Sequence, residues 1–382
     1  MFGHRLLKMA AWPGERRFAA GRADLESVQR RKLALLLRKV AAWEVGQRQG
    51  TAADWQWETF AEQVPVSDYD HWRDPVDRAR ESGGNALIQS PVVRYQPTSG
   101  STSAIKWIPY TRHFLLELDN AISPWIVDLY RQFPRLRQGR HYWSMSWVPT
   151  SLRDSMRDDI NDDIQLMSMG KRLLAGATQA VPQDVSLART SEDSLFATLA
   201  YLISDSSLSM MSIWSPTFGL GLLKSMAMWR EELAEVLATG SWGNRMLGSN
   251  TQSCPRSPRG AELLRQWDGR LSADFFMALW PSLALVSAWD TAASGPWARQ
   301  LHALLPQAAF QGKGLWATEG VVTIPYQGQH ALAYRSHVYE FQDPSDGTIY
   351  APWELEQGQQ VMPLLSTGSG LLRYRLNDLV RV

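Results

Sequence analysis

The spacing of apolar residues predicts a chain that mixes helices with short strands. Apolar positions recur at helical spacing in residues 24–48, which carry a basic outer face, and again in residues 111–130. Short apolar and β-branched runs at 90–95 and 142–148 are typical of strands. Helical spacing then dominates from about residue 192 to residue 305. The first 300 residues are therefore expected to be mainly helical, with a few buried strands.

The pattern changes after residue 314. Short β-like runs, separated by Gly, Pro and Asp turns, occupy 321–324, 331–334, 337–341 and 360–365. The mixture predicts the α/β class: one large domain over residues 1–382, built of β-sheets flanked by helices, with a β-rich lobe at about 314–382. The last residues, 376–382, have strand character and no polar tail, so we expect that the chain has been cut there.

Charge and cysteine content exclude several classes of protein. Lys and Arg number 39 against 38 Asp and Glu, so the electrostatic argument for a nucleic-acid binder is missing. The single cysteine, Cys254, excludes an intramolecular disulfide framework and suits a reducing cytoplasm. No apolar run approaches the length of a membrane span. We expect a cytoplasmic protein that binds neither nucleic acid nor membrane.

A hydroxyl-rich loop follows the predicted strand at 90–95. It consists of Thr98, Ser99, Gly100, Ser101 and Thr102, with Lys106 shortly after it. Hydroxyls and free backbone N–H groups can wrap phosphate oxygens, and the nearby ammonium supplies a countercharge. The spacing of a Walker A loop is absent, which disfavours a P-loop hydrolase. Taken alone, such a loop is more often a plain connector.

Two later segments carry further candidate ligands. Thr318 could contact a phosphate and Glu319 could bind a Mg²⁺ ion whose other ligands are water and phosphate oxygens. Arg375 could meet a phosphate, and Asp378 could accept hydrogen bonds from both hydroxyls of a ribose. Taken alone, Glu319 could instead be a surface residue, and Arg375 and Asp378 an internal ion pair.

In order and spacing, the three segments resemble the nucleotide-binding motifs of the acyl-acid amido synthetases. This family of adenylate-forming enzymes is best known from plant enzymes that conjugate auxin and jasmonate to amino acids. The resemblance covers about residues 25–382, and it extends to segments at 60–69, 214–218, 279–283 and 340–341. An excess of Arg over Lys favours a bacterial member.

The resemblance implies the fold of the large N-terminal adenylation domain and a ligase that uses ATP and Mg²⁺. A small-molecule carboxylic acid would become an acyl-adenylate, and an amine or amino acid would then attack it to give an amide. The residues carried over are Thr98, Ser99, Gly100, Ser101 and Thr102 for the phosphates, Thr318 for the α-phosphate, Glu319 for the metal, Lys106 and Arg375 for charge, and Asp378 for the ribose. Trp214 and Phe218 are candidates for the acyl cleft, because such clefts are largely apolar and aromatic.

The chain departs from the family pattern in three places. Asn377 replaces the glycine before the ribose-binding Asp; since Asn tolerates left-handed backbone angles, we expect the turn to be retained. The aromatic residue three positions before Thr318 is replaced by Leu315, with Trp316 beside it. Relatives continue into a small mobile lid domain, which we expect to be missing here, and no lysine follows Lys313 that could replace one from the lid.

Other functional classes are less well supported. No G-x-S-x-G nucleophile elbow is present, which disfavours a serine hydrolase. His330 and His337 lie seven residues apart without a zinc-ligand pattern, so we interpret each as a packed or exposed residue. The acidic run 158–163 is expected to be a solvated loop. A non-catalytic nucleotide- or acyl-binding module, paired with a partner that supplies the lid, remains an alternative.

Overall fold

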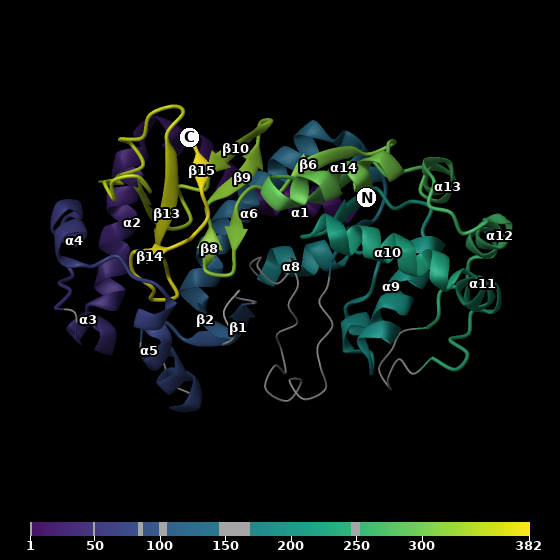
Figure 1. Ribbon diagram of the computed structural model, residues 1–382, viewed down its shortest axis with the longest axis horizontal. Helices are drawn as coiled ribbons and strands as arrows, with labels where there is room; N and C mark the ends of the chain where they lie inside the picture. The colour runs from purple at the N-terminus through teal and green to yellow at the C-terminus, as the bar shows by residue number, and fades with distance from the viewer. Residues whose placement is uncertain (1, 49, 83–86, 99–104, 145–168, 246–252) are drawn as a thin grey trace. The chain divides into compact units, whose positions relative to one another are not determined.

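The computed structural model describes residues 2–48, 50–82, 87–98, 105–144, 169–245 and 253–382 (Figure 1). The chain divides into two compact units. The parallel-sheet unit comprises Met1–Ala11 and Ile126–Gly314, and the antiparallel-sheet unit comprises Trp12–Trp125 and Leu315–Val382. The boundaries between them fall within α1 (Phe2–Gly21), within α6 (Arg112–Gln132) and between Gly314 and Leu315, so each unit combines segments that are distant in the sequence.

The first unit contains a four-stranded parallel sheet. Its strands are β3 (His141–Trp143), β4 (Met210–Ser212), β5 (Leu285–Ala288) and β6 (Ala309–Gly312), which lie in that order. Every residue of β3, β4 and β5 is buried, as expected for a parallel sheet that is covered on both faces. The sequence of these strands is accordingly mostly apolar, and the polar residues His141, Ser212 and Ser287 are buried as well.

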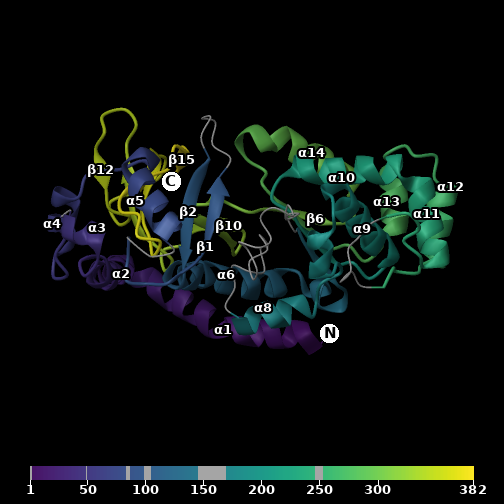
Figure 2. The same cartoon turned by 90° about the horizontal axis from the view of Figure 1, so that it is seen from below.

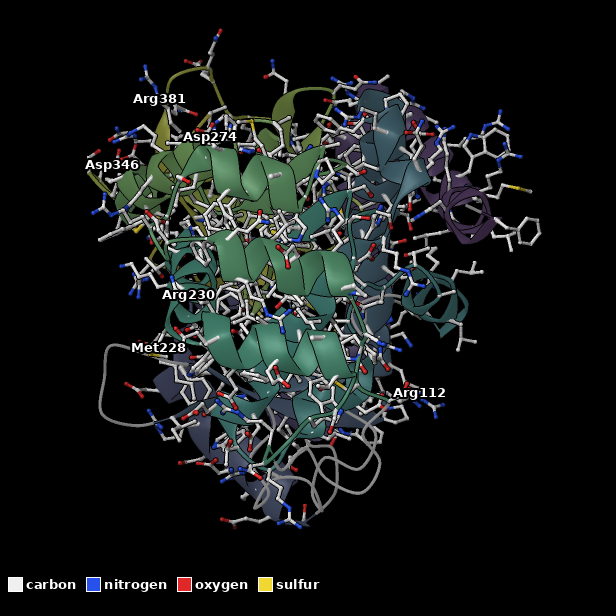
Figure 3. The ribbon with its side chains drawn as sticks, turned by 90° about the vertical axis from the view of Figure 1, so that its right-hand side faces the viewer. Arg112, Met228, Arg230, Asp274, Asp346 and Arg381 are labelled. Carbon is white, nitrogen blue, oxygen red and sulfur yellow. The ribbon has the colours of Figure 1, made fainter. Side chains whose placement is uncertain are left out.

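The helices of this unit are α8 (Met169–Gly176), α9 (Ser191–Ser204), α10 (Pro216–Met228), α11 (Arg230–Thr239), α12 (Pro258–Gln266), α13 (Ala273–Leu279) and α14 (Gly295–Leu304). Hydroxyl side chains start several of them: those of Ser215, Ser257 and Ser272 accept hydrogen bonds from backbone N–H groups of the first turn. Met228 and Arg230, on either side of the break between α10 and α11, lie at the surface (Figure 3).

The second unit is built of antiparallel strands and four further helices. The helices are α2 (Leu25–Val40), α3 (Glu44–Arg48), α4 (Trp57–Gln63) and α5 (Tyr69–Ser82). β1 (Val92–Thr98) and β2 (Lys106–Thr111) lie side by side as a long hairpin (Figure 2). Two shorter hairpins are formed by β7 (Trp316–Ala317) with β8 (Gly320–Val321) and by β9 (Thr323–Tyr326) with β10 (Gln329–Leu332).

The main sheet of this unit lies near the C-terminus. Its order is β12 (Ile349–Tyr350), β11 (Val338–Gln342), β13 (Gln360–Ser366) and β14 (Tyr374–Arg375), and β15 (Val380–Arg381) also pairs with β13. The predicted α/β class and the β-rich region near the C-terminus are therefore confirmed. The predicted strand at 321–324 is divided between β8 and β9 at Val322. Residues 145–148 and the acidic run 158–163 lie outside the described residues.

The first helix, α1, was not expected from the sequence. Its buried residues Leu7, Ala11, Glu15 and Phe18 form only a narrow stripe, whereas Phe2, Met9 and Trp12 on the outer surface are exposed. Apolar residues on both faces hide the helical period, and Pro13 lies inside the helix. In the described part of the chain, no helix is both long and apolar enough to cross a membrane.

Candidate active site

The second predicted segment forms a tight turn between β7 and β8. Trp316 pairs with Val321 and Ala317 pairs with Gly320, so that Thr318 and Glu319 are the two residues of the turn. Both side chains are half-buried. A Cβ atom on Gly320 would lie 2.8 Å from Leu365 Cδ1 and 2.9 Å from His337 Nε2. Only glycine therefore fits at this position, and it lets the turn pack closely against the main sheet.

Two tyrosine hydroxyls contact this turn. Tyr374 donates to Glu319 Oε1 at 3.1 Å, and Tyr110 donates to the Thr318 carbonyl oxygen at 3.0 Å. Burial, together with the neighbouring Glu319 carboxylate, holds the pKa of Tyr374 well above its usual value, so its hydroxyl stays protonated and remains a donor. Because Tyr374 belongs to β14, the structure brings the second and third predicted segments together.

The first segment lies at the end of the β1–β2 hairpin. Thr98 and Lys106 are opposite each other there and are half-buried. Lys106 Nζ lies 5.8 Å from the centre of the Tyr69 ring. Lys106 and Tyr110 are on the same face of β2, because side chains alternate along a strand. Ser99, Gly100, Ser101 and Thr102 lie outside the described residues.

The third segment turns differently from our expectation. Arg373, with φ 46°, has the left-handed backbone conformation there, and Asn377 does not, so the expected left-handed turn at Asn377 is wrong. The reason is that the chain already turns before β14, where Gly370 has φ 98°. Arg375 is half-buried, and its backbone N–H donates to the Ser67 carbonyl at 2.9 Å. Asp378 is exposed.

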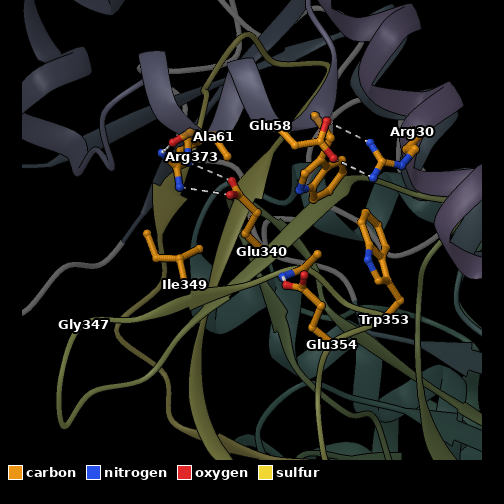
Figure 4. Close-up of a pocket in the computed structure, with 11 residues that line it drawn as sticks. Arg30, Glu58, Ala61, Glu340, Gly347, Ile349, Trp353, Glu354 and Arg373 are labelled. Carbon is orange, nitrogen blue, oxygen red and sulfur yellow. Dashed lines mark hydrogen bonds and ion pairs between the residues drawn. The ribbon is translucent and has the colours of Figure 1, made fainter.

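A cavity of about 390 Å³ is lined by Arg373 and by residues of α2, α4, β11 and β12, and two ion pairs lie in its wall (Figure 4). Arg373 donates to both oxygens of Glu340, at 2.8 and 3.0 Å, and also to the carbonyls of Ala61 and Val64. Nearer the surface, Arg30 forms an ion pair of 2.7 Å with Glu58. Since Arg373 directly precedes Tyr374, its buried ion pair anchors the strand that carries Tyr374 and Arg375.

Trp214 and Phe218 belong to the other unit, at the carboxyl end of β4. The centre of the Trp214 ring lies 5.6 Å from the centre of the Trp289 ring, and Lys313 Nζ lies 4.4 Å from the centre of the Trp214 ring. The Lys313 ammonium is buried and donates to Ser212 Oγ at 2.7 Å. Phe218, in the first turn of α10, is 38% exposed. Carboxyl ends of parallel strands are the usual place for ligands in such sheets.

Comparison with known proteins identifies the family. The model of the GH3 family N-terminal domain matches residues 15–310, and that of the GH3 family central domain matches residues 330–382. The chain belongs to the GH3 family. A structure titled GH3.15 acyl acid amido synthetase superimposes on the GH3 chain with a TM-score of 0.74 at 17% identity. A second structure, titled AtGH3.15 acyl acid amido synthetase in complex with 2,4-DB, gives the same values.

Each of these matches covers 94% of the GH3 chain and 65% of the matched chain, so the GH3 chain spans about two-thirds of its structural neighbours. A search among curated proteins finds no significant match. The family prediction is confirmed, and the likeness confirms the predicted fold. The roles of individual residues stay predictions.

Several residues of the site were not predicted from the sequence. Tyr374 lies inside one of the three motifs, but no role was predicted for it. Tyr110 lies outside all three motifs, as do His337, which accepts a hydrogen bond from the Val321 N–H on β8, and Glu117, which contacts His337. In the described parts of the GH3 chain, no group of three or more His, Cys, Asp or Glu residues could hold a metal ion. A Mg²⁺ ion held by one carboxylate, water and phosphate oxygens does not need such a group. The predicted role of Glu319 is therefore compatible with this result.

Proposed function

We propose that the GH3 chain forms the large N-terminal adenylation domain of an ATP-dependent acyl-acid amido synthetase. The observation that carries this proposal is the hydrogen bond between Tyr374 and Glu319, which joins two motifs separated by more than fifty residues in sequence. Family membership and the likeness to two amido synthetase structures support it. The substrates would be a small-molecule carboxylic acid, ATP, and an amine or amino acid. A lid, in the same protein or a separate one, would act in the second step.

The first step needs positioning and charge stabilisation rather than a base. A carboxylic acid is already ionised at pH 7, so its oxygen can attack the α-phosphorus of ATP while the bond to pyrophosphate breaks. Thr318 would donate to an α-phosphate oxygen, and Lys106 and Arg375 would offset the phosphate charge. The oxygens of Thr98, Ser99, Ser101 and Thr102 and the backbone at Gly100 would hold the remaining phosphate oxygens.

Glu319 would hold Mg²⁺, which neutralises phosphate charge when bound. The half-buried carboxylate suits this role, since Tyr374 orients it from one side. Asp378 would accept hydrogen bonds from the ribose hydroxyls. In the second step the amine attacks the acyl carbon and AMP leaves. Trp214 and Phe218 would line the acyl cleft, and an aromatic or otherwise apolar acid suits their side chains.

The proposed function predicts exchange of labelled pyrophosphate into ATP that depends on a carboxylic acid. A panel of aryl, indole and fatty acids should contain one class that supports exchange in the presence of Mg²⁺. Exchange with one class would establish adenylation and name the acid. ATP binding without exchange for any acid would favour the non-catalytic nucleotide-binding module, and absence of ATP binding would contradict the proposal.

Replacing Asp378 by alanine is expected to weaken ATP binding by about tenfold. A charged acceptor that binds hydroxyl groups contributes about 1.5 kcal/mol or more, and 1.4 kcal/mol corresponds to a factor of ten. Isothermal titration with ATP measures the change. Asn377→Ala is the matched control, because Asn377 is also exposed, adjoins Asp378 and has no assigned role. Equal affinity of Asp378→Ala and the control would refute the ribose assignment.

A further inference from the structure

The β7–β8 hairpin is too short to fix its own turn. Beyond its two residue pairs it has only the hydrogen bonds from the Val322 and Thr323 N–H groups to the Leu315 carbonyl, and isolated two-stranded hairpins are marginal in stability even when they are longer. Its geometry therefore depends on what surrounds it. Besides the two tyrosines at the turn, Val321 on β8 is held at both backbone groups: its N–H donates to His337 Nε2 at 3.2 Å, and its carbonyl accepts from the Tyr339 hydroxyl at 2.7 Å.

The contact with Val321 determines the tautomer of His337. A backbone N–H can only donate, so Nε2 has to be the unprotonated acceptor and the proton lies on Nδ1. Nδ1 in turn donates to Glu117 Oε2 at 2.9 Å. The ring has no solvent exposure and stacks on Phe114, one turn before Glu117 on α6. Burial lowers the pKa of His337 against the opposing effect of Glu117, which favours this neutral form.

The Glu117 carboxylate is linked to β8 through His337, and it directly contacts the loop that precedes β14. Its Oε2 also accepts from the Gly368 N–H at 2.7 Å, in the loop that leads from β13 to Tyr374 and Arg375 on β14. Lys32 lies 3.7 Å from Oε1 and partly offsets the charge. Although burial alone would raise the pKa of Glu117, Lys32 and His337 hold it below its usual value, so the carboxylate is ionised. One buried carboxylate thus connects the turn of Thr318 and Glu319 with the segment that supplies Tyr374.

We propose that Glu117 and His337 are positioning residues for the adenylation step. Together they fix the position of Glu319 through the backbone of Val321, and Glu117 fixes the position of Tyr374 through the loop at Gly368. This inference rests on the proposed function. Nothing in the motifs themselves requires either residue. Groups that orient a ligating residue from behind commonly change activity or metal affinity by about 10- to 100-fold when they are removed.

A matched pair of variants separates positioning from packing. In His337→Gln the side-chain amide reaches the place of Nε2 and can still accept from Val321, whereas in His337→Asn it reaches only the place of Nδ1 and contacts Glu117 alone. His337→Asn is expected to lose about 10- to 100-fold in kcat for acid-dependent pyrophosphate exchange and to need more Mg²⁺, with the KM for the acid little changed. His337→Gln should retain most of the activity.

A second pair tests the carboxylate in case the histidine variants do not fold. Glu117→Gln keeps an acceptor oxygen for His337 and Gly368, whereas Glu117→Met fills the space without one. Thermal melting establishes that each variant is folded before its kinetics are compared. Kinetics of Glu117→Met equal to those of Glu117→Gln, or of His337→Asn equal to those of His337→Gln, would overturn the proposal, since the members of each pair differ in the hydrogen bonds that they can form here.

Amide hydrogen exchange provides a readout that needs no substrate. The Val321 amide should exchange about tenfold faster in His337→Asn than in His337→Gln, because its acceptor is lost. Unchanged protection would overturn the proposal. If the wild-type chain shows no pyrophosphate exchange with any acid, the proposed function fails. The exchange rate of the Val321 amide then tests by itself whether Glu117 and His337 hold the hairpin in place. Lost protection with wild-type kinetics would reduce both residues to a structural role.

Discussion

Replacing Glu319 by alanine is expected to reduce Mg²⁺-dependent adenylation by about 100-fold or more while the chain stays folded. The carboxylate is half-buried in a two-residue turn, and the only hydrogen bond through which the described structure holds it comes from Tyr374 at 3.1 Å. Removing a preorganised group that stabilises transition-state charge commonly costs a factor of about 100 to 1,000. Acid-dependent pyrophosphate exchange at saturating ATP, measured across a range of Mg²⁺ concentrations, tests this expectation.

The controls separate a metal ligand from an orienting contact. Glu319→Gln keeps the size of the side chain and an acceptor for Tyr374 but loses the charge, so it should be nearly as impaired as Glu319→Ala. Tyr374→Phe keeps the carboxylate and removes its donor, so it should lose less and recover at higher Mg²⁺. An unchanged exchange rate in Glu319→Ala would remove the metal assignment, and full activity of Glu319→Gln would show that charge is not what Glu319 contributes.

The sequence predicted the fold well where one period dominates a segment. The helix expected at 111–130 is α6, and the strand expected at 337–341 is β11, displaced by one residue. It failed for α1, where Phe2, Met9 and Trp12 are apolar but exposed. The sequence also predicted one helix where the structure has two, α2 and α3. The break between them, at Ala41–Trp43, contains no glycine or proline that would have indicated it.

Candidate site residues could be named from the sequence where motifs occur. Thr318, Glu319, Arg375 and Asp378 were named because their order and spacing resemble the motifs of a family, and their roles stay predictions. Their neighbours were not named, because Tyr110 and His337 reach the hairpin from distant segments, Glu117 contacts His337, and none of the three carries a local pattern. The left-handed residue was also misplaced, since the chain turns before β14, at Gly370 and Arg373, and not at Asn377. A motif thus indicates which atoms act, whereas the fold decides what orients them.

Breaking the buried pair between Arg373 and Glu340 should have the largest effect on stability. The two side chains are 4% and 3% exposed, and removing one partner of such a pair costs about 3–5 kcal/mol in the free energy of unfolding. We expect this loss for Glu340→Ala, because Arg373 cannot release its proton and stays charged in a buried place. Glu58→Ala is the matched control: its ion pair with Arg30 lines the same cavity but is exposed, so the loss should be much smaller.

The free energy of unfolding of the reverse variant, Arg373→Met, should depend on pH in a way that the free energy of unfolding of Glu340→Ala does not. Burial already raises the pKa of Glu340 against the opposing effect of Arg373, and removing the guanidinium raises it further. The native state of the variant then binds the proton more tightly than the unfolded chain does. Its free energy of unfolding is therefore highest below the pKa of an unfolded glutamate and falls as pH rises toward the raised native value.

Urea unfolding of the two single variants and of Glu340→Leu/Arg373→Met, from pH 4.5 to pH 8, tests the pair directly. The double variant should be more stable than either single variant, because it leaves no uncompensated charge in the interior. Losses in the two single variants that simply add in the double variant would show that the pair is not coupled. Coupling would instead establish that the ion pair between Arg373 and Glu340 stabilises the fold next to β14. Because Tyr374 on β14 contacts Glu319, the stability of the chain and the geometry of the site would then depend on the same contact.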